Sequence, residues 1–379
     1  MKTRKNARAL LLLPGAFCPA GGLEMYDRLI IKGVQEVMRE REGVCETLVL
    51  LDKDEHIDAR YIDPDQPRPL TFAASRPRFA AGAVARALAH RPDLIVFGHV
   101  NFSSLGLALR AVRPSAQQWY LVYGIDVWHR ISAPQRAATR TAEKILSISD
   151  YTRSELVRHN GVDRAKVGLL PCALDPFWSA DFMRLAEGAP LTSLQRPLLL
   201  TVARLAETER YKGVDQVIRA LPIIARDIPD VRYAVVGTGG DRPRLEALAR
   251  ELGVADRVEF RGRVSAEALA HAYAECALFV MPSAKEGFGI VFLEAALFGK
   301  PSIAGNHGGS PEVVEDGVTG RLVTYDDVPG FAKVATEMLG DPRRLRDMGQ
   351  AALDRLNARF TYPIFLRTLR DHIREALDR

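Results

Sequence analysis

Short apolar runs alternate with longer amphipathic stretches along this 379-residue chain, and this alternation limits the possible folds more than any other feature. Short buried runs joined by helices are typical of a parallel sheet that is covered on both faces. In the first half, the pattern predicts helices over Leu23–Arg41 and Ala80–Ala89 and strands over Ala9–Leu13, Thr47–Leu51, Leu94–Phe97, Trp119–Tyr123 and Lys144–Ile148. The sequence therefore predicts an α/β fold.

A break in the pattern indicates two domains. Prolines and glycines interrupt regular structure there, so we expect a linker near residues 176–197. Beyond it, we expect helices over Gly213–Arg226, Arg242–Leu252 and Ile290–Phe298 and strands over Leu198–Val202, Tyr233–Val236, Val258–Phe260, Leu278–Met281, Pro301–Ala304 and Gly320–Val323. We predict two doubly wound Rossmann-like domains, residues 1–178 and 179–357, facing an interdomain cleft. A last helix, residues 358–379, is expected to pack back on the first domain.

The composition is that of an ordinary globular protein. Hydrophobic residues make up 47% of the chain and charged residues 26%, which excludes a disordered chain, a collagen-like fibre and a disulfide-stabilised mini-protein. The apolar stretch Ala9–Pro14 is too short to cross a bilayer and lacks a signal-peptide cleavage site. The four cysteines, Cys18, Cys45, Cys172 and Cys276, form no C-x-x-C motif. We expect free thiols in a reducing cytoplasm.

The positive charge is concentrated in the N-terminal part. Residues 1–140 contain 20 Lys and Arg and 14 Asp and Glu, a balance of +6; the whole chain carries +5, so residues 141–379 carry −1. This asymmetry favours an anionic partner such as a membrane surface or phosphate groups, although a merely soluble, arginine-rich surface would give the same count. No basic block is interleaved with aromatic residues, so nucleic acid is not an expected partner.

The densest candidate site follows the strand expected to end at Met281. Gly287 and Gly289 lie before a helix, where glycines let a ligand approach and the free N–H groups and positive dipole end of a helix suit a phosphate. Glu286 and Glu294 flank this loop eight positions apart. Burying Glu294 among apolar neighbours is costly unless the carboxylate is hydrogen-bonded, and two sugar hydroxyls would satisfy it. The alternative is an exposed helix face.

Two cations and a second glycine turn lie earlier in the second half. Arg204 follows a strand and Lys212 precedes a helix, and such a pair is suited to a nucleotide diphosphate, unless both are surface cations. Gly237 and Gly239 follow another strand and suggest a dinucleotide site. The third glycine of G-x-G-x-x-G is replaced by Arg242, however, so the evidence for a nicotinamide cofactor is weak.

The first half carries its own candidates. Gly21 and Gly22 lie between a strand and a helix, where a loop can close over phosphate and sugar. His99, Asp126 and Trp128 follow strands, and the carboxylate and indole suit an acceptor sugar. Asp52-Lys53-Asp54 has the spacing of a D-x-D metal motif but lies far from Glu286 in the sequence, and we expect no metal there.

The run Glu286–Gly320 resembles the donor-binding region of family 4 of the retaining glycosyltransferases (glycosyl transferases group 1), which have the GT-B fold. It carries the E-x7-E motif of Glu286 and Glu294, the Gly308-Gly309 turn and the Asp316–Gly320 hairpin. Further resembling segments are Gly21-Gly22, Ile148-Ser149 with Thr152, Leu170-Pro171 with Asp175, and Val202–Leu205 with Lys212-Gly213. The chain departs from the family pattern at Ala203 (usually Gly), at Tyr123 (usually His) and in an insertion at residues 207–211.

The resemblance implies a role for each candidate. Arg204 and Lys212 would steady the leaving diphosphate, Glu286 would hold the sugar, and His99 would lie near the transferred sugar. Asp126 and Trp128 would contact the acceptor. The residues that would bind the donor are Gly21, Gly22, Gly237, Gly239, Arg263, Val264, Gly287, Phe288, Gly289, Ile290, Val291 and Glu294, with Glu294 on the ribose.

The implied function is the transfer of a hexose, with retention, from a UDP- or GDP-linked sugar to a glycan, glycolipid or lipid-linked acceptor, as in polysaccharide biosynthesis. The resemblance implies no metal and no other cofactor. It places the acceptor site in the N-terminal domain and the donor site in the C-terminal one, with the enzyme in the cytoplasm and peripheral at the inner face of a membrane. Three alternatives stay open: a sugar-nucleotide epimerase of the same fold, a nicotinamide oxidoreductase and a non-catalytic nucleotide-binding protein.

Overall fold

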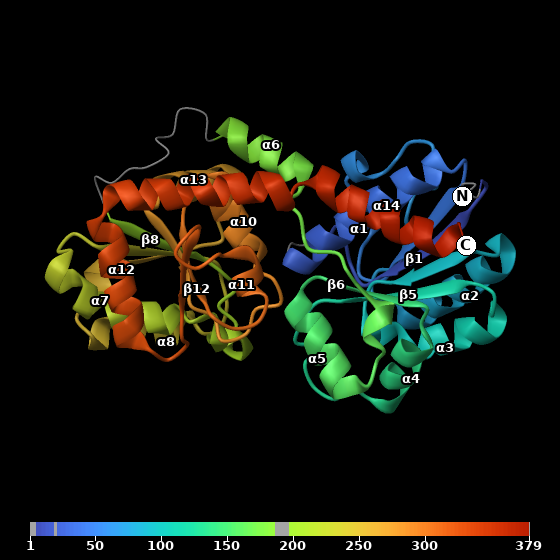
Figure 1. Cartoon of the computed structure of the whole chain (residues 1–379), viewed down its shortest axis with the longest axis horizontal. Coiled ribbons are helices and arrows are strands. Elements are labelled where there is room, and N and C mark those ends of the chain that lie inside the picture. The colour runs from blue at the N-terminus through green and yellow to red at the C-terminus, as the bar shows by residue number, and fades with distance from the viewer. Residues whose placement is uncertain (1–4, 19–20, 186–196, 379) are drawn as a thin grey trace. The chain divides into compact units, whose positions relative to one another are not determined.

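The computed structural model describes residues 5–18, 21–185 and 197–378 (Figure 1). The chain divides into two compact units. The N-terminal unit contains Met1–Asp175 and Tyr362–Arg379, and the C-terminal unit contains Pro176–Thr361. The boundaries predicted at 178 and 358 lie a few residues from these transitions. Part of the expected linker is helical, because α6 covers Pro176–Leu185; the rest, residues 186–196, lies outside the described residues.

The N-terminal unit is built on a seven-stranded parallel sheet in the order β3-β2-β1-β4-β5-β6-β7. The strands are β1 Arg8–Leu13, β2 Val44–Val49, β3 Leu70–Thr71, β4 Leu94–Phe97, β5 Gln117–Val122, β6 Lys144–Ser147 and β7 Val167–Leu169. The helices are α1 Gly22–Glu40, α2 Arg76–His90, α3 Ser103–Val112, α4 Ala133–Thr141, α5 Asp150–Asn160 and α14 Tyr362–Leu377. The sheet order reverses at β1, as in doubly wound folds.

The C-terminal unit contains a six-stranded parallel sheet in the order β10-β9-β8-β11-β12-β13. The strands are β8 Leu198–Val202, β9 Arg232–Val236, β10 Val258–Gly262, β11 Leu278–Met281, β12 Ser302–Gly305 and β13 Gly320–Val323. Besides α6, the helices are α7 Val214–Asp227, α8 Arg242–Glu251, α9 Ala266–Glu275, α10 Ile290–Leu297, α11 Ser310–Val313, α12 Val328–Gly340 and α13 Pro342–Arg359. The predicted α/β fold class is confirmed.

The parallel sheets bring the candidate residues to one edge of each unit. All strand pairs in both sheets are parallel, so the carboxyl ends of the strands and the loops that follow them lie at the same edge. The loops after β8, β9, β10 and β11 carry the predicted cations and most of the predicted donor residues. Gly21 and Gly22, also predicted to bind the donor, follow β1, and the acceptor candidates follow β4 and β5. Within the described residues, no helix is both long enough and apolar enough to cross a membrane.

Helix α14 joins the end of the chain to the N-terminal unit, where it packs beside α1 (Figure 1). The Phe365 ring meets the Tyr26 ring of α1 edge to face at 5.7 Å. Gly33 of α1 allows this close approach, because a Cβ atom there would lie 2.8 Å from Leu369 Cδ2. Arg41 also binds Asp378 through two hydrogen bonds of 2.6 and 2.9 Å. The last residues are therefore part of the N-terminal core.

Candidate active site

Three loops of the C-terminal unit, after β8, β11 and β12, are held together by backbone contacts at the carboxyl edge of its sheet. Ala284 N, after β11, donates a hydrogen bond of 2.8 Å to Tyr211 O in the β8–α7 loop. Gly309 N, after β12, donates one of 2.6 Å to Glu286 O. A Cβ atom on Gly309 would lie 2.2 Å from Gly287 O, so only glycine permits this approach. The loops that carry the predicted cations and glutamates therefore form one cluster.

Lys212 and Glu286 meet within this cluster. Lys212 Nζ donates to Glu286 Oε2 at 2.6 Å, and both side chains are largely buried. Burial alone would lower the pKa of Lys212, but the Glu286 carboxylate raises it above its ordinary value. The lysine is therefore charged at neutral pH. The two residues are 74 positions apart in the sequence, yet they place one cation and one carboxylate at a single point.

Arg204, the other predicted cation, lies at the surface of the same cluster. Its side chain is 75% exposed and pairs with Glu209, which belongs to the insertion at residues 207–211. Arg204 and Lys212 both line a small, shallow pocket, and the Asp241–Arg244 ion pair lines it too. Exposed ion pairs contribute little to stability, so the Arg204 guanidinium is available to an anionic ligand at small cost.

Glu294 lies on α10, with its side chain buried. The Tyr273 hydroxyl donates a hydrogen bond of 2.5 Å to Glu294 Oε2. Burial raises the pKa of Glu294 to about 7, although the Tyr273 hydrogen bond acts in the opposite direction. Gly289, with φ of +92°, precedes the first turn of α10, and such a left-handed residue is favourable for glycine alone. The predicted run Gly287–Val291 therefore forms the N-terminal end of this helix.

The predicted Gly237-x-Gly239 turn has a structural explanation. A Cβ atom on Gly237 would lie 1.8 Å from Ala203 O, and one on Gly239 would lie 2.1 Å from Leu205 C. These glycines are therefore needed for the close packing of the β9 loop on the β8 loop. Gly237 N also donates to Gly262 O at the end of β10. The contact brings the following predicted residues, Arg263 and Val264, to the same sheet edge.

Asp52 organises the loop after β1, a role that sequence reasoning missed. Its buried carboxylate accepts hydrogen bonds of 2.9, 2.8 and 2.5 Å from the backbone N–H groups of Ala16, Phe17 and Cys18. Asp54 instead accepts one of 2.7 Å from Thr71 Oγ1. The two carboxylates of the D-x-D pattern therefore serve different segments. Among the described residues, no cluster of three or more His, Cys, Asp or Glu is suited to hold a metal ion.

Gly21 and Gly22 lie where this loop enters α1. Gly21 is the N-cap residue, and Gly22 is the first helical residue. A Cβ atom on Gly21 would come within 2.8 Å of Glu24 Oε2. The two glycines therefore occupy the N-terminal end of a long helix at the carboxyl edge of the sheet, as predicted from their place between strand and helix.

His99 and Asp126 lie beside one another after β4 and β5. Asn101 N donates to His99 Nδ1 at 3.1 Å, and Tyr123 N donates to Asp126 Oδ1 at 3.2 Å. Burial lowers the pKa of His99, although the Asp126 carboxyl acts in the opposite direction. The imidazole is therefore neutral at pH 7. Because Nδ1 is an acceptor, the proton lies on Nε2, which can donate to a ligand hydroxyl.

The structure does not give Trp128 the expected position. Its side chain is only 5% exposed, and the indole N–H donates to Thr152 Oγ1 at 3.1 Å. The ring meets Tyr151 edge to face at 5.1 Å within the core of the N-terminal unit. In this conformation a sugar cannot stack on Trp128, and the residue holds α5 against the loop after β5. Sequence reasoning missed this because a tryptophan after a strand suits a binding loop and a core equally.

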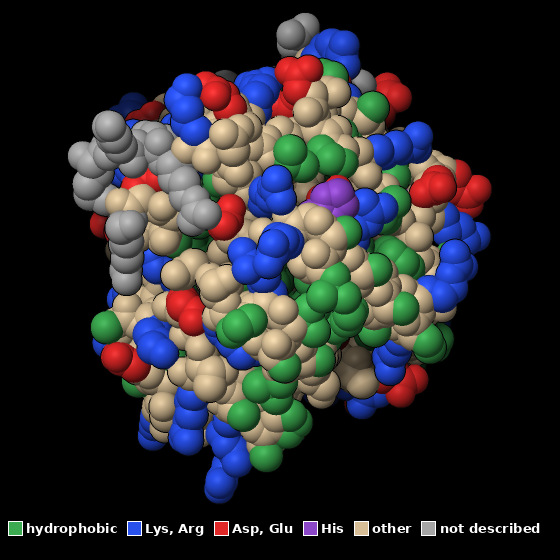
Figure 2. All heavy atoms as spheres, turned by 90° about the vertical axis from the view of Figure 1, so that its right-hand side faces the viewer, with side chains coloured by type: hydrophobic (Ala, Val, Ile, Leu, Met, Phe, Trp, Pro, Cys, Tyr) green, Lys and Arg blue, Asp and Glu red, His purple; other side chains and the backbone are tan. Residues whose placement is uncertain are grey.

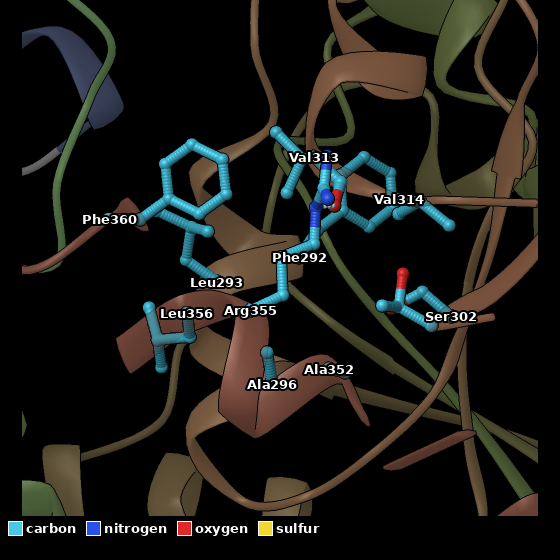
Figure 3. Close-up of a pocket in the computed structure, with 11 residues that line it drawn as sticks. Phe292, Leu293, Ala296, Ser302, Val313, Val314, Ala352, Arg355, Leu356 and Phe360 are labelled. Carbon is cyan, nitrogen blue, oxygen red and sulfur yellow. Dashed lines mark hydrogen bonds between the residues drawn. The ribbon is translucent and has the colours of Figure 1, made fainter. Parts of the chain in front are cut away.

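A second pocket in the C-terminal unit is apolar. The side chains around it include Phe292, Leu293 and Phe360, and Arg355 enters from α13 (Figure 3). The Arg355 guanidinium donates to Val313 O at 3.0 Å and also binds Glu312 O and Glu315, which holds α13 against α11. None of the predicted site residues lines this pocket.

Two Rossmann-like units and an E-x7-E loop in the second unit are the features of a GT-B protein. The family model "Glycosyl transferases group 1" matches residues 188–355, and the model "Glycosyltransferase Family 4" matches residues 40–176. Together they cover most of the chain. The chain belongs to the glycosyltransferase family with the GT-B fold that these two models describe.

Curated relatives match parts of the chain. A GDP-mannose-dependent alpha-(1-6)-phosphatidylinositol monomannoside mannosyltransferase of Mycolicibacterium smegmatis is 36% identical over 240 residues, 59% of this chain and 61% of that protein. A D-inositol 3-phosphate glycosyltransferase of Streptomyces avermitilis is 35% identical over 222 residues, 56% of this chain and 47% of the relative. The chain thus spans roughly half to two thirds of the length of these relatives.

Solved structures share the fold over nearly the whole chain. The Anabaena protein HepE in complex with UDP and glucose has a TM-score of 0.77 at 20% identity, covering 98% of this chain and 100% of that one. Sucrose-phosphate synthase from Thermosynechococcus elongatus has a TM-score of 0.77 at 21% identity, covering 98% and 99%. At these identities the likeness extends to the fold alone.

Proposed function

We propose that the chain transfers a hexose from a UDP- or GDP-linked sugar to a sugar-containing or lipid-linked acceptor, with retention and without a metal ion. The observation that carries the proposal is the 2.6 Å contact between Lys212 Nζ and Glu286 Oε2. The bond broken in a nucleotide sugar joins a phosphate, which needs a cation, to a sugar ring, whose hydroxyls need an acceptor. Lys212 and Glu286 offer both groups at one point.

The charges of the cluster suit the chemistry of this transfer. As the bond between the anomeric carbon and the phosphate oxygen breaks, negative charge builds on the diphosphate. Lys212, Arg204 and the N-terminal end of α10 would stabilise that charge. The acceptor oxygen bonds to the anomeric carbon on the face that the leaving group departs from, and its proton passes to the leaving phosphate oxygen. The products are a glycoside and a nucleoside diphosphate, so no co-reactant is needed.

GDP-mannose is the first donor to test. The Mycolicibacterium relative is named for that donor, whereas the HepE structure contains UDP. In this chain Glu294 would accept hydrogen bonds from the ribose hydroxyls, which both nucleotides share. The side chain of Val264 and the guanidinium of Arg263 follow β10 at the same sheet edge and would border the base.

An anionic, lipid-linked acceptor fits the charge of the N-terminal unit. Residues 66–142 contain ten arginines, no lysine and two aspartates, a balance of +8. Both aspartates, Asp93 and Asp126, already accept hydrogen bonds from backbone N–H groups. On the side where Figure 1 labels α2 and α3, Lys and Arg side chains surround apolar surface (Figure 2). Leu88 of α2 is 61% exposed there.

This combination supports peripheral binding at an anionic membrane surface. Basic side chains contribute about 1 kcal/mol each near such a surface, and exposed apolar side chains add to the affinity. We place the enzyme on the cytoplasmic side, because Cys45 and Cys276 are free and buried, as expected of a protein in a reducing compartment.

A donor screen tests the proposal. Thermal unfolding of the protein is followed with GDP-mannose and UDP-, GDP- and N-acetyl-hexose donors, since a ligand that binds the folded state raises the Tm. The donor that stabilises the protein is then incubated with and without an α-mannoside acceptor, and the product is identified by NMR. We expect one donor class to raise the Tm and the product to retain the anomeric configuration. An altered donor sugar formed without acceptor would instead indicate an epimerase, and no stabilisation by any donor would contradict the proposal.

A further inference from the structure

A buried tyrosine from a different helix contacts the second glutamate of the E-x7-E motif. Tyr273 lies on α9, and its hydroxyl donates a hydrogen bond of 2.5 Å to Oε2 of Glu294 on α10. We propose that Tyr273 is a positioning residue that fixes the Glu294 carboxylate for the ribose of the donor nucleotide. This inference rests on the proposed function, which assigns Glu294 to the ribose.

The Tyr273 ring is packed against two aromatic neighbours. It is fully buried and stacks on Phe298 with a centroid distance of 5.7 Å and an interplanar angle of 11°. The Phe279 ring of β11 lies at 5.9 Å. Close-packed aromatic rings leave little room for another rotamer. The hydroxyl therefore stays directed at Glu294.

The backbone next to Tyr273 is fixed as well. Lys300, whose side chain is fully buried, donates a hydrogen bond of 2.7 Å from Nζ to Ala274 O, in the last turn of α9. A cation at this position also interacts favourably with the negative end of the helix dipole. The Cys276 thiol donates to Tyr273 O at 3.4 Å. The G-K-P segment that contains Lys300 thus anchors the end of the helix that presents Tyr273.

One hydrogen bond leaves most of the carboxylate available. An ionised carboxylate offers about four lone-pair sites, and Tyr273 occupies one of them on Oε2. Oε1 can then accept from a ribose hydroxyl. Without the tyrosine donor, burial would favour the protonated acid, which has fewer acceptor sites. The tyrosine therefore orients the carboxylate and also favours its ionised form.

Few other groups can disturb this pair in the neutral pH range. Burial raises the pKa of Glu294 to about 7, and Tyr273 is the one group that lowers it. At the end of α9, burial raises the pKa of the Cys276 thiol to about 12, so the thiol stays neutral. Burial lowers the pKa of Lys300, whose Nζ donates to the Ala274 carbonyl, and Glu275 is exposed at the end of the helix. The terminal phosphate of a nucleoside diphosphate also titrates at about pH 6. The part of a change in nucleotide affinity near pH 7 that Glu294→Gln abolishes therefore reports on Glu294.

The test is a calorimetric titration of the whole protein with GDP and UDP between pH 5.5 and 9. The variants are Tyr273→Phe, Glu294→Gln and the double variant, and Tyr233→Phe is the matched control, because that buried hydroxyl donates to Thr201 Oγ1 instead. The ionised carboxylate binds better, so wild-type affinity is full above the pKa of Glu294 and falls as the pH drops through it. Removing the donor raises this pKa, so Tyr273→Phe shifts the fall upward by about one pH unit. We expect several-fold weaker binding at pH 7 and unchanged binding at pH 9.

The outcomes separate this inference from the proposed function. If Glu294→Gln does not weaken nucleotide binding, the ribose role fails, and the positioning role fails with it. If Glu294→Gln weakens binding but Tyr273→Phe keeps the wild-type pH profile, only the positioning role is overturned. Weaker binding of the double variant than of Glu294→Gln alone would mark Tyr273 as merely structural, because its effect would not pass through the carboxylate.

A second variant covers the case in which Tyr273→Phe does not fold. 3-Fluorotyrosine incorporated at position 273 keeps the ring and the hydroxyl but makes the phenol a stronger hydrogen-bond donor. It stabilises the ionised carboxylate further, so the fall in affinity moves to lower pH. The same replacement at position 233 is the control. A profile that does not move, or that moves to higher pH, would contradict the inference.

Discussion

Glu286 and Glu294 belong to one motif but meet opposite surroundings. Glu286 forms an ion pair with Lys212, whereas Glu294 is buried against a neutral hydroxyl of Tyr273. A buried carboxylate without a cation is costly, and burial raises its pKa to about 7. The spacing in the sequence therefore identifies the two glutamates, but the side chains that contact each one determine its charge state.

The cations at the cluster give a first prediction. Lys212→Ala and Arg204→Ala should each lower kcat by about a hundredfold, because each removes a positive charge from the developing diphosphate charge. Steady-state kinetics with a saturating donor would measure this, and circular dichroism would check the fold. Lys285→Ala is the control, since that lysine is exposed on the same loop as Glu286. Near-normal turnover in both variants would refute the assignment.

The pairing of Arg204 with Glu209 gives a second prediction. Glu209→Gln removes the carboxylate that occupies the guanidinium, so donor affinity should rise by about threefold, in proportion to the small energy of an exposed ion pair. Calorimetric titration with the nucleoside diphosphate would show it. Glu207→Gln in the same insertion is the control, because Glu207 is exposed. An unchanged or lower affinity for Glu209→Gln would mean that Arg204 does not contact the diphosphate.

At the scale of elements, glycines and one carboxylate decide how the loops meet. The glycines at 237, 239 and 309 are required by the close approach of two backbones, not by the ligand alone. In the N-terminal unit, Asp52 of the loop after β2 holds the loop after β1 through three backbone N–H groups. The shape of each site edge therefore depends on contacts between neighbouring loops.

The Asp52 contacts give a third prediction. Asp52→Asn places N–H donors against backbone N–H groups, so the free energy of unfolding should fall by about 2 kcal/mol. Urea denaturation would measure it, with Asp54→Asn as the control, because the Asp54 carboxylate accepts a hydrogen bond from Thr71 Oγ1 and none from the loop after β1 in the described residues.

Wild-type activity should also survive excess EDTA. Activity that EDTA abolishes and Mg²⁺ or Mn²⁺ restores would assign Asp52 and Asp54 to a metal instead.

At the scale of the whole molecule, the chain returns to its first unit at its end. Besides the Arg41–Asp378 pair, Arg370 of α14 binds Glu40 of α1 through hydrogen bonds of 2.9 and 2.6 Å. The Leu369 and Ile373 side chains are buried. The two units are therefore not consecutive pieces of sequence, and the N-terminal unit is incomplete without residues 362–379.

Deletion of residues 362–379 is the fourth prediction. It uncovers the apolar face of α1, so the N-terminal unit should unfold at lower temperature, while the C-terminal unit, which contains none of these residues, keeps its transition. Differential scanning calorimetry would resolve the two transitions. The double charge reversal Arg370→Glu with Glu40→Arg is the control that keeps the pair. If the deletion lowered the unfolding temperature of both units equally, or of neither, the result would contradict the division of the chain into these two units.

The charge distribution gives a fifth prediction at this scale. The protein should sediment with anionic vesicles at low salt and be released at high salt, because the Debye length shrinks as ionic strength rises. Arg78→Glu with Arg91→Glu, exposed residues at the two ends of α2, should weaken binding by about tenfold. Arg343→Glu with Arg346→Glu on α13 is the control for net charge. If the protein bound the vesicles at neither salt concentration, the prediction would be wrong, and the positive charge would have no role in membrane binding.

The two parallel sheets and the loops that follow their strands were predictable from the sequence. The expected strands at Leu94–Phe97, Leu198–Val202, Leu278–Met281 and Gly320–Val323 have the observed bounds. Leu94–Phe97 and Leu278–Met281 are continuous apolar runs that are fully buried, whereas Gly320–Val323 is an edge strand that contains Arg321. The two short strands β3 and β7, at Leu70–Thr71 and Val167–Leu169, were not predicted. They are too short to give a pattern, and pairing with a neighbouring strand defines them.

Which side chains meet depends on the tertiary structure. Tyr273 and Glu294 are 21 positions apart, and Asp52 and Ala16 are 36 apart, so no local pattern links them. Trp128 shows the same limit, because its residue type suits a sugar platform and its burial makes it part of the core. Periodicity reports which face of an element is apolar; the partner on that face depends on strand order, which brings distant segments to one edge of a sheet.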